Sequence, residues 1–77
     1  MRGTVKKWLL EEGYGWISVD NEDDVWVHYS DLSLDLNRFP NGFRYLKEGQ
    51  KVEFDLLLNP RSQEQRRKAI HVVIIDE

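Results

Sequence analysis

The sequence predicts an all-β fold, a small closed barrel of five strands, on three observations. Short runs in which apolar and polar residues alternate recur along the 77 residues, and turn-forming residues separate them. One longer excursion, residues 31–45, interrupts this spacing after the third run. Pro40 and Gly42 within it argue against a long helix. Closing five short strands into a barrel removes the edge strands that would otherwise pair with other chains.

The first three strands are expected at residues 3–10, 14–20 and 25–30. The polar run Asn-Glu-Asp-Asp at residues 21–24 separates the second strand from the third and predicts a hairpin turn. We therefore expect these strands to pair in antiparallel fashion.

The second half of the chain predicts two more strands. Residues 51–58 place three apolar side chains on one face, and residues 69–75 are rich in β-branched side chains. Between them a polar turn begins at residue 59, and residues 63–68 are expected to form an extended loop because they are polar all round. The excursion is expected to begin with a short helical turn near residues 30–34 and to continue as an ordered loop.

Composition excludes several classes of protein. A chain of 77 residues builds one modest core, so we expect a single domain over residues 1–77. Without cysteine, neither a disulfide scaffold nor a cysteine-based zinc site is available. No stretch has the roughly 20 apolar residues of a membrane span, and no apolar signal segment opens the sequence, so we expect a cytoplasmic protein without membrane contact. The net charge of -3 argues against a protein held on duplex DNA mainly through phosphates.

The second and third strands carry aliphatic side chains on one face and aromatic side chains on the other, because successive strand residues point to opposite sides. The aliphatic face, expected to fill the barrel, holds Gly15, Ile17, Val19, Val25 and Val27. The outer face holds Tyr14, Trp16, Ser18, Trp26, His28 and Ser30. The expected register brings Trp16 near His28 and Ser18 near Trp26. Lys6 and Trp8 of the first strand are expected beside them.

Exposed rings bordered by lysines indicate a surface for unpaired nucleobases. A contiguous exposed apolar patch usually marks a binding site, and bases stack on aromatic side chains for about 1–3 kcal/mol each. Gly13 and Gly15 leave the ring of Tyr14 sterically open. Two other interpretations stay open on alternation alone: the rings pack under residues 31–45, or they contact a partner protein.

Two motifs resemble those of cold-shock domains. Gly-Tyr-Gly-Trp-Ile at residues 13–17 resembles the first ribonucleoprotein motif of that family, and Val-Trp-Val-His-Tyr-Ser at residues 25–30 resembles the second. The match extends in order over nearly the whole chain, through residues 3–6, residues 42–54, Ala69 and Val72. It implies an oligonucleotide/oligosaccharide-binding barrel that binds single-stranded RNA or DNA with little sequence preference. Such proteins act as RNA chaperones in translation or transcription.

Carried over position by position, the resemblance implies roles for individual residues. The base-stacking side chains are Tyr14, Trp16, Trp26, His28 and Tyr29, and Phe43 stacks from a loop. Lys6 matches a lysine that contacts the nucleic-acid backbone, and Asp24 matches an acid near the site.

Several positions depart from the family pattern. Lys7 stands where the family has a stacking tryptophan, and Trp8 compensates if the first strand is shifted or bulged. Glu12 replaces a lysine, which removes one expected cation. The loop before the last strand is longer and carries Arg61 among other cations. These changes indicate one of two things: part of the positive charge has moved onto the loops, or the chain is a divergent member with an altered ligand preference.

Two alternatives come from other classes of protein. A protein-interaction module on the same barrel would use the excursion, for a partner protein or for a dimer contact, because four apolar side chains lie there: Leu32, Leu34, Leu36 and Phe39. Otherwise a monomer is expected. An enzyme is not expected, since we find no nucleophile–histidine–acid arrangement, no phosphate-binding glycine loop and no metal spacing. Neither a cofactor nor a metal is expected, and His71 is only a weak candidate ligand.

Overall fold

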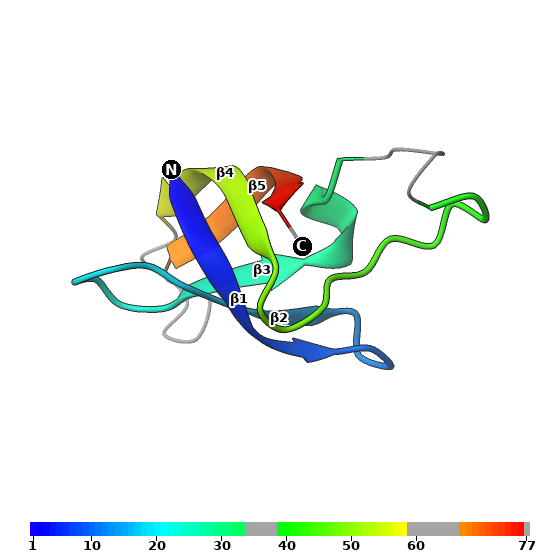
Figure 1. Ribbon diagram of the computed structural model, residues 1–77, viewed down its shortest axis with the longest axis horizontal. Helices are drawn as coiled ribbons and strands as arrows, with labels where there is room; N and C mark the ends of the chain where they lie inside the picture. The colour runs from blue at the N-terminus through cyan, green and yellow to red at the C-terminus, as the bar shows by residue number, and fades with distance from the viewer. Residues whose placement is uncertain (34–38, 59–66, 77) are drawn as a thin grey trace.

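Five strands close into a barrel in the computed structural model, which describes residues 1–33, 39–58 and 67–76 (Figure 1). The strands follow one another around the barrel in the order β1-β2-β3-β5-β4. Their bounds are β1 (Arg2–Leu9), β2 (Tyr14–Ser18), β3 (Val25–His28), β4 (Lys51–Leu58) and β5 (Arg67–Asp76). The predicted five-stranded all-β barrel is therefore confirmed, and each predicted strand overlaps its observed counterpart.

The barrel closes through a pairing that the local sequence pattern did not indicate. β3 and β5 run parallel, with Trp26 opposite Lys68 and Val27 opposite Ala69. The other strand pairings are antiparallel, as expected. β5 begins at Arg67, so Arg67 and Lys68 belong to a strand rather than to the loop that was expected over residues 63–68. Residues 63–66 lie outside the described residues.

The excursion after β3 begins with a short 3-10 helix, η1 (Tyr29–Asp31), close to the helical turn expected there. Leu32 follows it, bridges to Val72 of β5 and is buried. Figure 1 shows the segment from residue 39 returning along the barrel to enter β4. Within the described residues, no helix has the length and hydropathy needed to cross a membrane.

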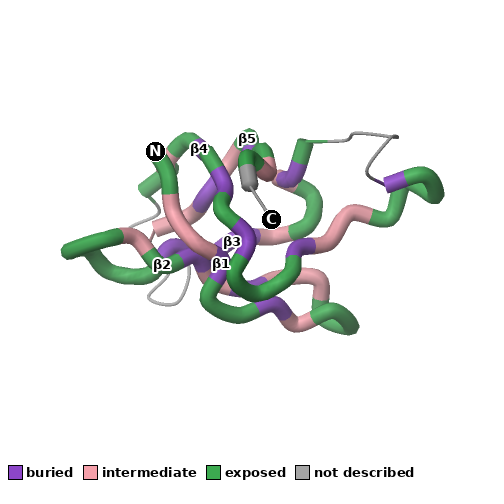
Figure 2. Tube along the Cα trace, viewed as in Figure 1, coloured by how far each residue is buried: buried purple, intermediate pink, exposed green. Residues whose placement is uncertain are grey.

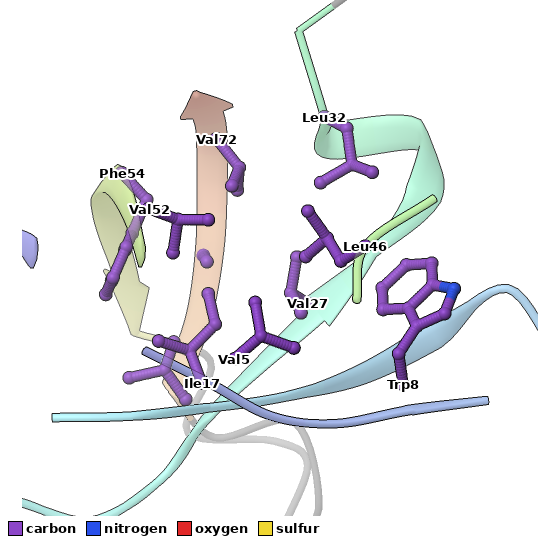
Figure 3. Close-up of a cluster of buried hydrophobic side chains, with 11 residues drawn as sticks. Val5, Trp8, Ile17, Val27, Leu32, Leu46, Val52, Phe54 and Val72 are labelled. Atoms are coloured by element: carbon purple, nitrogen blue, oxygen red, sulfur yellow. The ribbon is translucent and has the colours of Figure 1, made fainter. Parts of the chain in front are cut away.

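The aliphatic faces of the strands meet inside the barrel and form one core cluster, as the alternation predicted. Figure 2 shows buried residues recurring along the strands among exposed ones, and Figure 3 shows the core side chains converging. Burying each large apolar side chain contributes about 1.5–3 kcal/mol. The largest fully buried side chains are Phe54, Ile17, Val5, Val25, Val27, Val52 and Val72.

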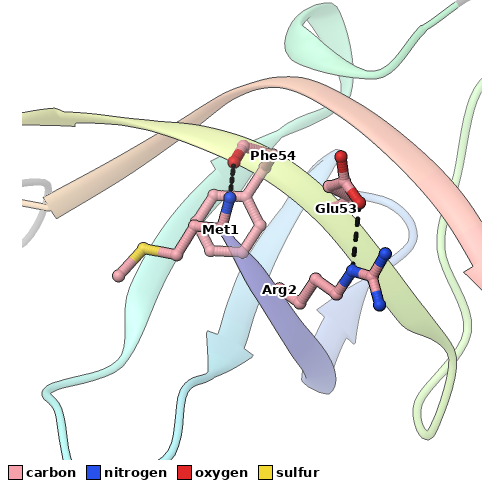
Figure 4. Close-up of polar contacts among 4 residues, drawn as sticks. All are labelled: Met1, Arg2, Glu53 and Phe54. Carbon is pink, nitrogen blue, oxygen red and sulfur yellow. Dashed lines mark hydrogen bonds and ion pairs between the residues drawn. The ribbon is translucent and has the colours of Figure 1, made fainter.

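The start of β1 is fastened to β4 by polar contacts (Figure 4). The amino group of Met1 donates a hydrogen bond to the carbonyl oxygen of Phe54 at 2.8 Å, and Arg2 Nε donates to Glu53 Oε2 at 3.0 Å. β1 thus pairs with β4 at its start, over residues 2–4, and with β2 from Thr4 onward.

Candidate nucleic-acid interface

A β-bulge in β1 decides which of its side chains reach the outer face. The pairing with β2 shifts between Val5 and Lys7, so that Val5 lies opposite Ile17 and Lys7 lies opposite Trp16. The extra residue, Lys6, interrupts the alternation, because a bulge places two residues of one strand against one of the other. As a result Lys6 and Lys7 are both exposed, while Val5 and Trp8 both point into the barrel.

The expectation that Trp8 lies beside Lys6 on the outer face is therefore wrong. Trp8 is only 9% exposed and belongs to the core cluster. Figure 3 shows its indole nitrogen on the ring edge that points away from the centre of the cluster. A bulge in β1 was the condition under which Trp8 would compensate for Lys7, but the observed bulge turns Trp8 into the core and leaves Lys7 on the outer face.

The register of β2 and β3 also differs from the expected one. Trp16 lies opposite Trp26, and Tyr14 lies opposite His28. The cause is the turn: the amide of Glu22 bonds to the carbonyl of Val19 at 3.2 Å, so the chain reverses earlier than predicted. The register differs from the expected one by an even number of residues. The same side chains therefore stay on the same face of the sheet.

The rings of β2, β3 and η1 form a continuous row that we call the aromatic platform: Tyr14, Trp16, Trp26, His28 and Tyr29. Tyr14 lies between the two tryptophans, with ring centroids 5.6 Å from Trp16 and 5.9 Å from Trp26. His28 stacks on Trp26 at 5.7 Å with an interplanar angle of 24°, and Tyr29 lies 4.4 Å from His28. The predicted stacking residues of these strands therefore come together.

Exposure varies along the aromatic platform. Tyr29 is 45% exposed, and Tyr14, Trp16 and His28 are partly exposed. Trp26 is only 9% exposed, which corrects the expectation of an open ring there. Its neighbours cover it: Tyr14 and His28 pack beside it, and the ammonium group of Lys68 lies 5.7 Å from its ring centroid. Trp26 thus supports the platform and offers little surface of its own.

Phe43 lies apart from the row. Phe43 is 59% exposed. Among the described residues its ring lies closest to that of Tyr45, with centroids 6.1 Å apart. The guanidinium of the intervening Arg44 lies 6.0 Å from the ring centroid of Tyr29, which places this segment next to the platform's end. Arg61, the remaining predicted site residue, lies outside the described residues.

Three cations around the aromatic platform are paired with carboxylates. Lys6 Nζ lies 2.8 Å from Asp24 Oδ2, and Lys68 Nζ lies 3.1 Å from Asp31 Oδ2. A third pair joins Arg67 to Glu22 at 3.4 Å. The phosphates of a bound strand would therefore compete with these carboxylates for the same cations.

Comparison with known proteins identifies the family to which this barrel belongs. The family model of the 'Cold-shock' DNA-binding domain matches residues 1–75. The chain belongs to the cold-shock domain family. Cold shock protein CspC of Bacillus subtilis (strain 168) is 47% identical over 55 residues, which cover 71% of this chain and 74% of the relative. Cold shock protein CspA of Staphylococcus haemolyticus is 42% identical over 60 residues, covering 78% and 82%, and CspA of Staphylococcus aureus (strain USA300) gives the same figures.

Membership of the cold-shock domain family supports nucleic-acid binding as the function. Sequence reasoning found the rings of this cold-shock domain but missed two cations beside them, Arg44 and Lys68. Arg44 lies within the matched segment that leads into β4, yet nothing local indicated that it would reach Tyr29. Lys68 reaches Trp26 only because β5 pairs with β3, a contact between distant parts of the chain.

Local hydrogen bonds orient His28 in this cold-shock domain. The backbone amide of Ser30 donates to His28 Nδ1 at 3.2 Å, and Ser30 Oγ lies 2.7 Å from the same atom. A backbone amide only donates, so Nδ1 carries a lone pair and the neutral ring holds its proton on Nε2. His28 therefore presents an N–H donor on the edge opposite η1, beside the stacked faces of the platform.

The side chains considered as a metal ligand and as an interaction surface make contacts within the protein itself. His71 bonds to Asp55 of β4 at 3.0 Å, and within the described residues no group of histidines and carboxylates has the arrangement of a metal site. Leu32 and Phe39, which motivated an interaction surface, are buried at 4% and 5% exposure. Leu34 and Leu36 lie outside the described residues. The excursion thus contributes at least two of its four apolar side chains to the protein's own packing.

Proposed function

We propose that this chain binds single-stranded RNA or DNA by stacking unpaired bases on the aromatic platform. The observation that carries the proposal is the unbroken row of rings from Trp16 to Tyr29, partly exposed and bordered by cations. Each exposed ring offers a face on which any base stacks, so sequence preference is expected to be low. His28 adds a single N–H donor for a base carbonyl or a phosphate oxygen.

The expected affinity follows from the number of accessible rings. Three stacked bases at about 2 kcal/mol each give roughly 6 kcal/mol, which corresponds to a dissociation constant of about 40 μM. The cost of association weakens this value, so dissociation constants in the high micromolar range are expected. A duplex hides its base faces. Binding single strands therefore opens weak helices by mass action, which is the activity of an RNA chaperone.

Fluorescence titration tests the proposal directly. An oligothymidylate is expected to quench tryptophan emission because bases stack near Trp16, whereas a duplex of the same length is expected to have little effect. Buried Trp8 supplies a constant background. Absence of quenching at high micromolar oligonucleotide, with the protein folded by circular dichroism, would exclude the aromatic platform as a base-binding surface.

Replacing Asp24 with asparagine is expected to strengthen binding about twofold to fivefold at low salt. The substitution frees Lys6 from its carboxylate partner, and an exposed pair of this kind contributes at most about 1 kcal/mol to stability. A newly available lysine is expected to steepen the plot of log affinity against log salt by about 0.7. Both quantities come from titrations at several salt concentrations.

The matched control is Glu53→Gln, which removes the carboxylate of the Arg2–Glu53 pair where β1 meets β4. That variant changes the net charge equally and is expected to leave the salt dependence unchanged. Equal effects of the two variants would show that overall charge, and not release of Lys6, governs the affinity.

A further inference from the structure

Lys68 lies in the same row of side chains as two rings of the aromatic platform. Around the barrel, Trp16 of β2 lies opposite Trp26 of β3, and Trp26 lies opposite Lys68 of β5. On its other side Lys68 lies opposite Leu57 of β4. Because a strand pairs with β5 on each side at this position, the backbone of Lys68 is held in place and its side chain is the part that can move.

The side chain of Lys68 covers part of the Trp26 ring. Its ammonium group lies 5.7 Å from the ring centroid. The Lys68 side chain is 27% exposed, whereas that of Lys6, another lysine beside the aromatic platform, is 60% exposed. A lysine stem commonly lies along apolar surface while its charged end reaches a polar partner. Lys68 therefore occupies space against Trp26 that a base would otherwise use.

Asp31 holds the ammonium group of Lys68 in this position. Asp31 Oδ2 lies 3.1 Å from Lys68 Nζ, and the Asp31 side chain is only 20% exposed. Asp31 is the last residue of η1, and the amide of Leu32 that follows it donates to the carbonyl of Tyr29 at 3.1 Å. The ion pair thus connects η1 to β5 beside the ring of Trp26.

A phosphate group of a bound strand can replace the Asp31 carboxylate as the partner of Lys68. Both groups are anions that accept hydrogen bonds from an ammonium group, and the flexible stem of Lys68 allows it to turn from one to the other. A strand stacked on Tyr14 and His28 brings its phosphates near, because the centroids of these rings lie 5.9 Å and 5.7 Å from that of Trp26. Once Lys68 has turned away, more of the Trp26 ring is open to a base.

We propose that Lys68 and Asp31 form a cover that closes Trp26 in the free protein and opens when a phosphate of the bound strand replaces Asp31. The inference rests on the proposed function, because the strand that opens the cover is the one stacked on the aromatic platform. It gives Lys68 a role beyond that of a fixed positive charge, since its side chain controls how many rings are open to bases.

Two substitutions of Lys68 separate the cover from the charge. Lys68→Met and Lys68→Ala both remove the positive charge, but methionine keeps a long flexible side chain against Trp26 and alanine does not. The alanine variant is expected to bind an oligothymidylate at least about fivefold more tightly than the methionine variant, because one more base stacks. Equal affinities, or tighter binding by the methionine variant, would overturn the inference.

Acrylamide quenching of tryptophan emission tests the cover without a ligand. In a Trp16→Phe background the remaining tryptophans, Trp8 and Trp26, are both 9% exposed. Adding Lys68→Ala is expected to raise the quenching constant about twofold or more, whereas adding Lys68→Met is expected to leave it unchanged. Asp31→Asn keeps Lys68 but removes its partner, so an intermediate rise is expected. Unchanged quenching in a folded alanine variant would show that Lys68 does not cover the ring.

The outcomes separate the cover from the aromatic platform. If the wild-type protein binds the strand and the two Lys68 variants bind equally, the cover is wrong and the platform remains. If no form of the protein binds a single strand, both proposals fail. Should Lys68→Ala not fold by circular dichroism, Asp31→Asn takes its place, and Glu53→Gln, which changes the net charge equally, is its control. Equal affinity and equal quenching in those two variants would then exclude the cover.

Discussion

Replacing Gly15 with alanine is expected to destabilise the protein by at least about 3 kcal/mol. Gly15 lies opposite Trp8 where β1 and β2 approach closely. A Cβ atom there would overlap the carbonyl oxygen of Lys7 and lie 2.9 Å from the Cα atom of Trp8. Both obstacles belong to the backbone, which cannot rotate away as a side chain would. The strands would have to separate at the point where β1 turns Trp8 into the core.

Urea unfolding followed by tryptophan emission measures this effect, and Gly42→Ala is its control. Gly42 has a φ of 73°, and a Cβ atom added there would meet no other atom within 4 Å. Alanine at this position therefore meets only the strain of the left-handed conformation, about 1–2 kcal/mol. Gly15 has no positive φ, so its cost is purely steric. If the two variants lose the same stability, close approach of the strands is not what requires Gly15.

Local sequence predicted the strands and their inward faces, but it did not predict every strand pairing. Alternation identified the five strands and the inward faces, because a period of two follows directly from strand geometry. The parallel pairing of β3 with β5 was not predicted, because it joins residues such as Val27 and Ala69 that are far apart in the chain. No local pattern records a long-range pairing of this kind.

The candidate site was predictable in its residue types and less so in its geometry. The rings on β2 and β3 were placed on the correct face, since an even shift of register preserves the face. Trp8 was misplaced because one bulged residue in β1 reverses the alternation after it. Lys68, one of the side chains that lie against Trp26, reaches it through the parallel pairing of β3 with β5, which was not predicted. The face on which each ring lies was therefore predictable from the sequence. The effect of the bulge on Trp8 and the contact between Lys68 and Trp26 were not.

The low exposure of Trp26 changes which substitutions test binding most cleanly. Removing Trp26 would leave a void beside Tyr14 and His28, so stability and affinity would change together. Trp16 and Tyr29 lie at opposite ends of the platform and retain exposed surface. No ring contact joins them directly among the described residues. Their contributions to binding are therefore expected to be nearly additive.

The double variant Trp16→Ala/Tyr29→Ala is expected to weaken binding of a single-stranded oligonucleotide by about 2–6 kcal/mol, or at least about 30-fold. Each substitution removes one stacking surface worth about 1–3 kcal/mol. Because both rings lie outside the core cluster, the barrel is expected to stay folded. Calorimetric titration measures the affinity, and circular dichroism with thermal unfolding reports the fold.

The conservative double variant Trp16→Phe/Tyr29→Phe is the control, because it keeps a ring at each position and removes only the indole and the hydroxyl. It is expected to retain most of the affinity if stacking provides the energy. A folded alanine double variant that binds as tightly as the wild type would contradict the platform. Loss of affinity in the phenylalanine variant as large as in the alanine variant would instead assign the binding energy to the polar groups, since flat surface alone would then not suffice.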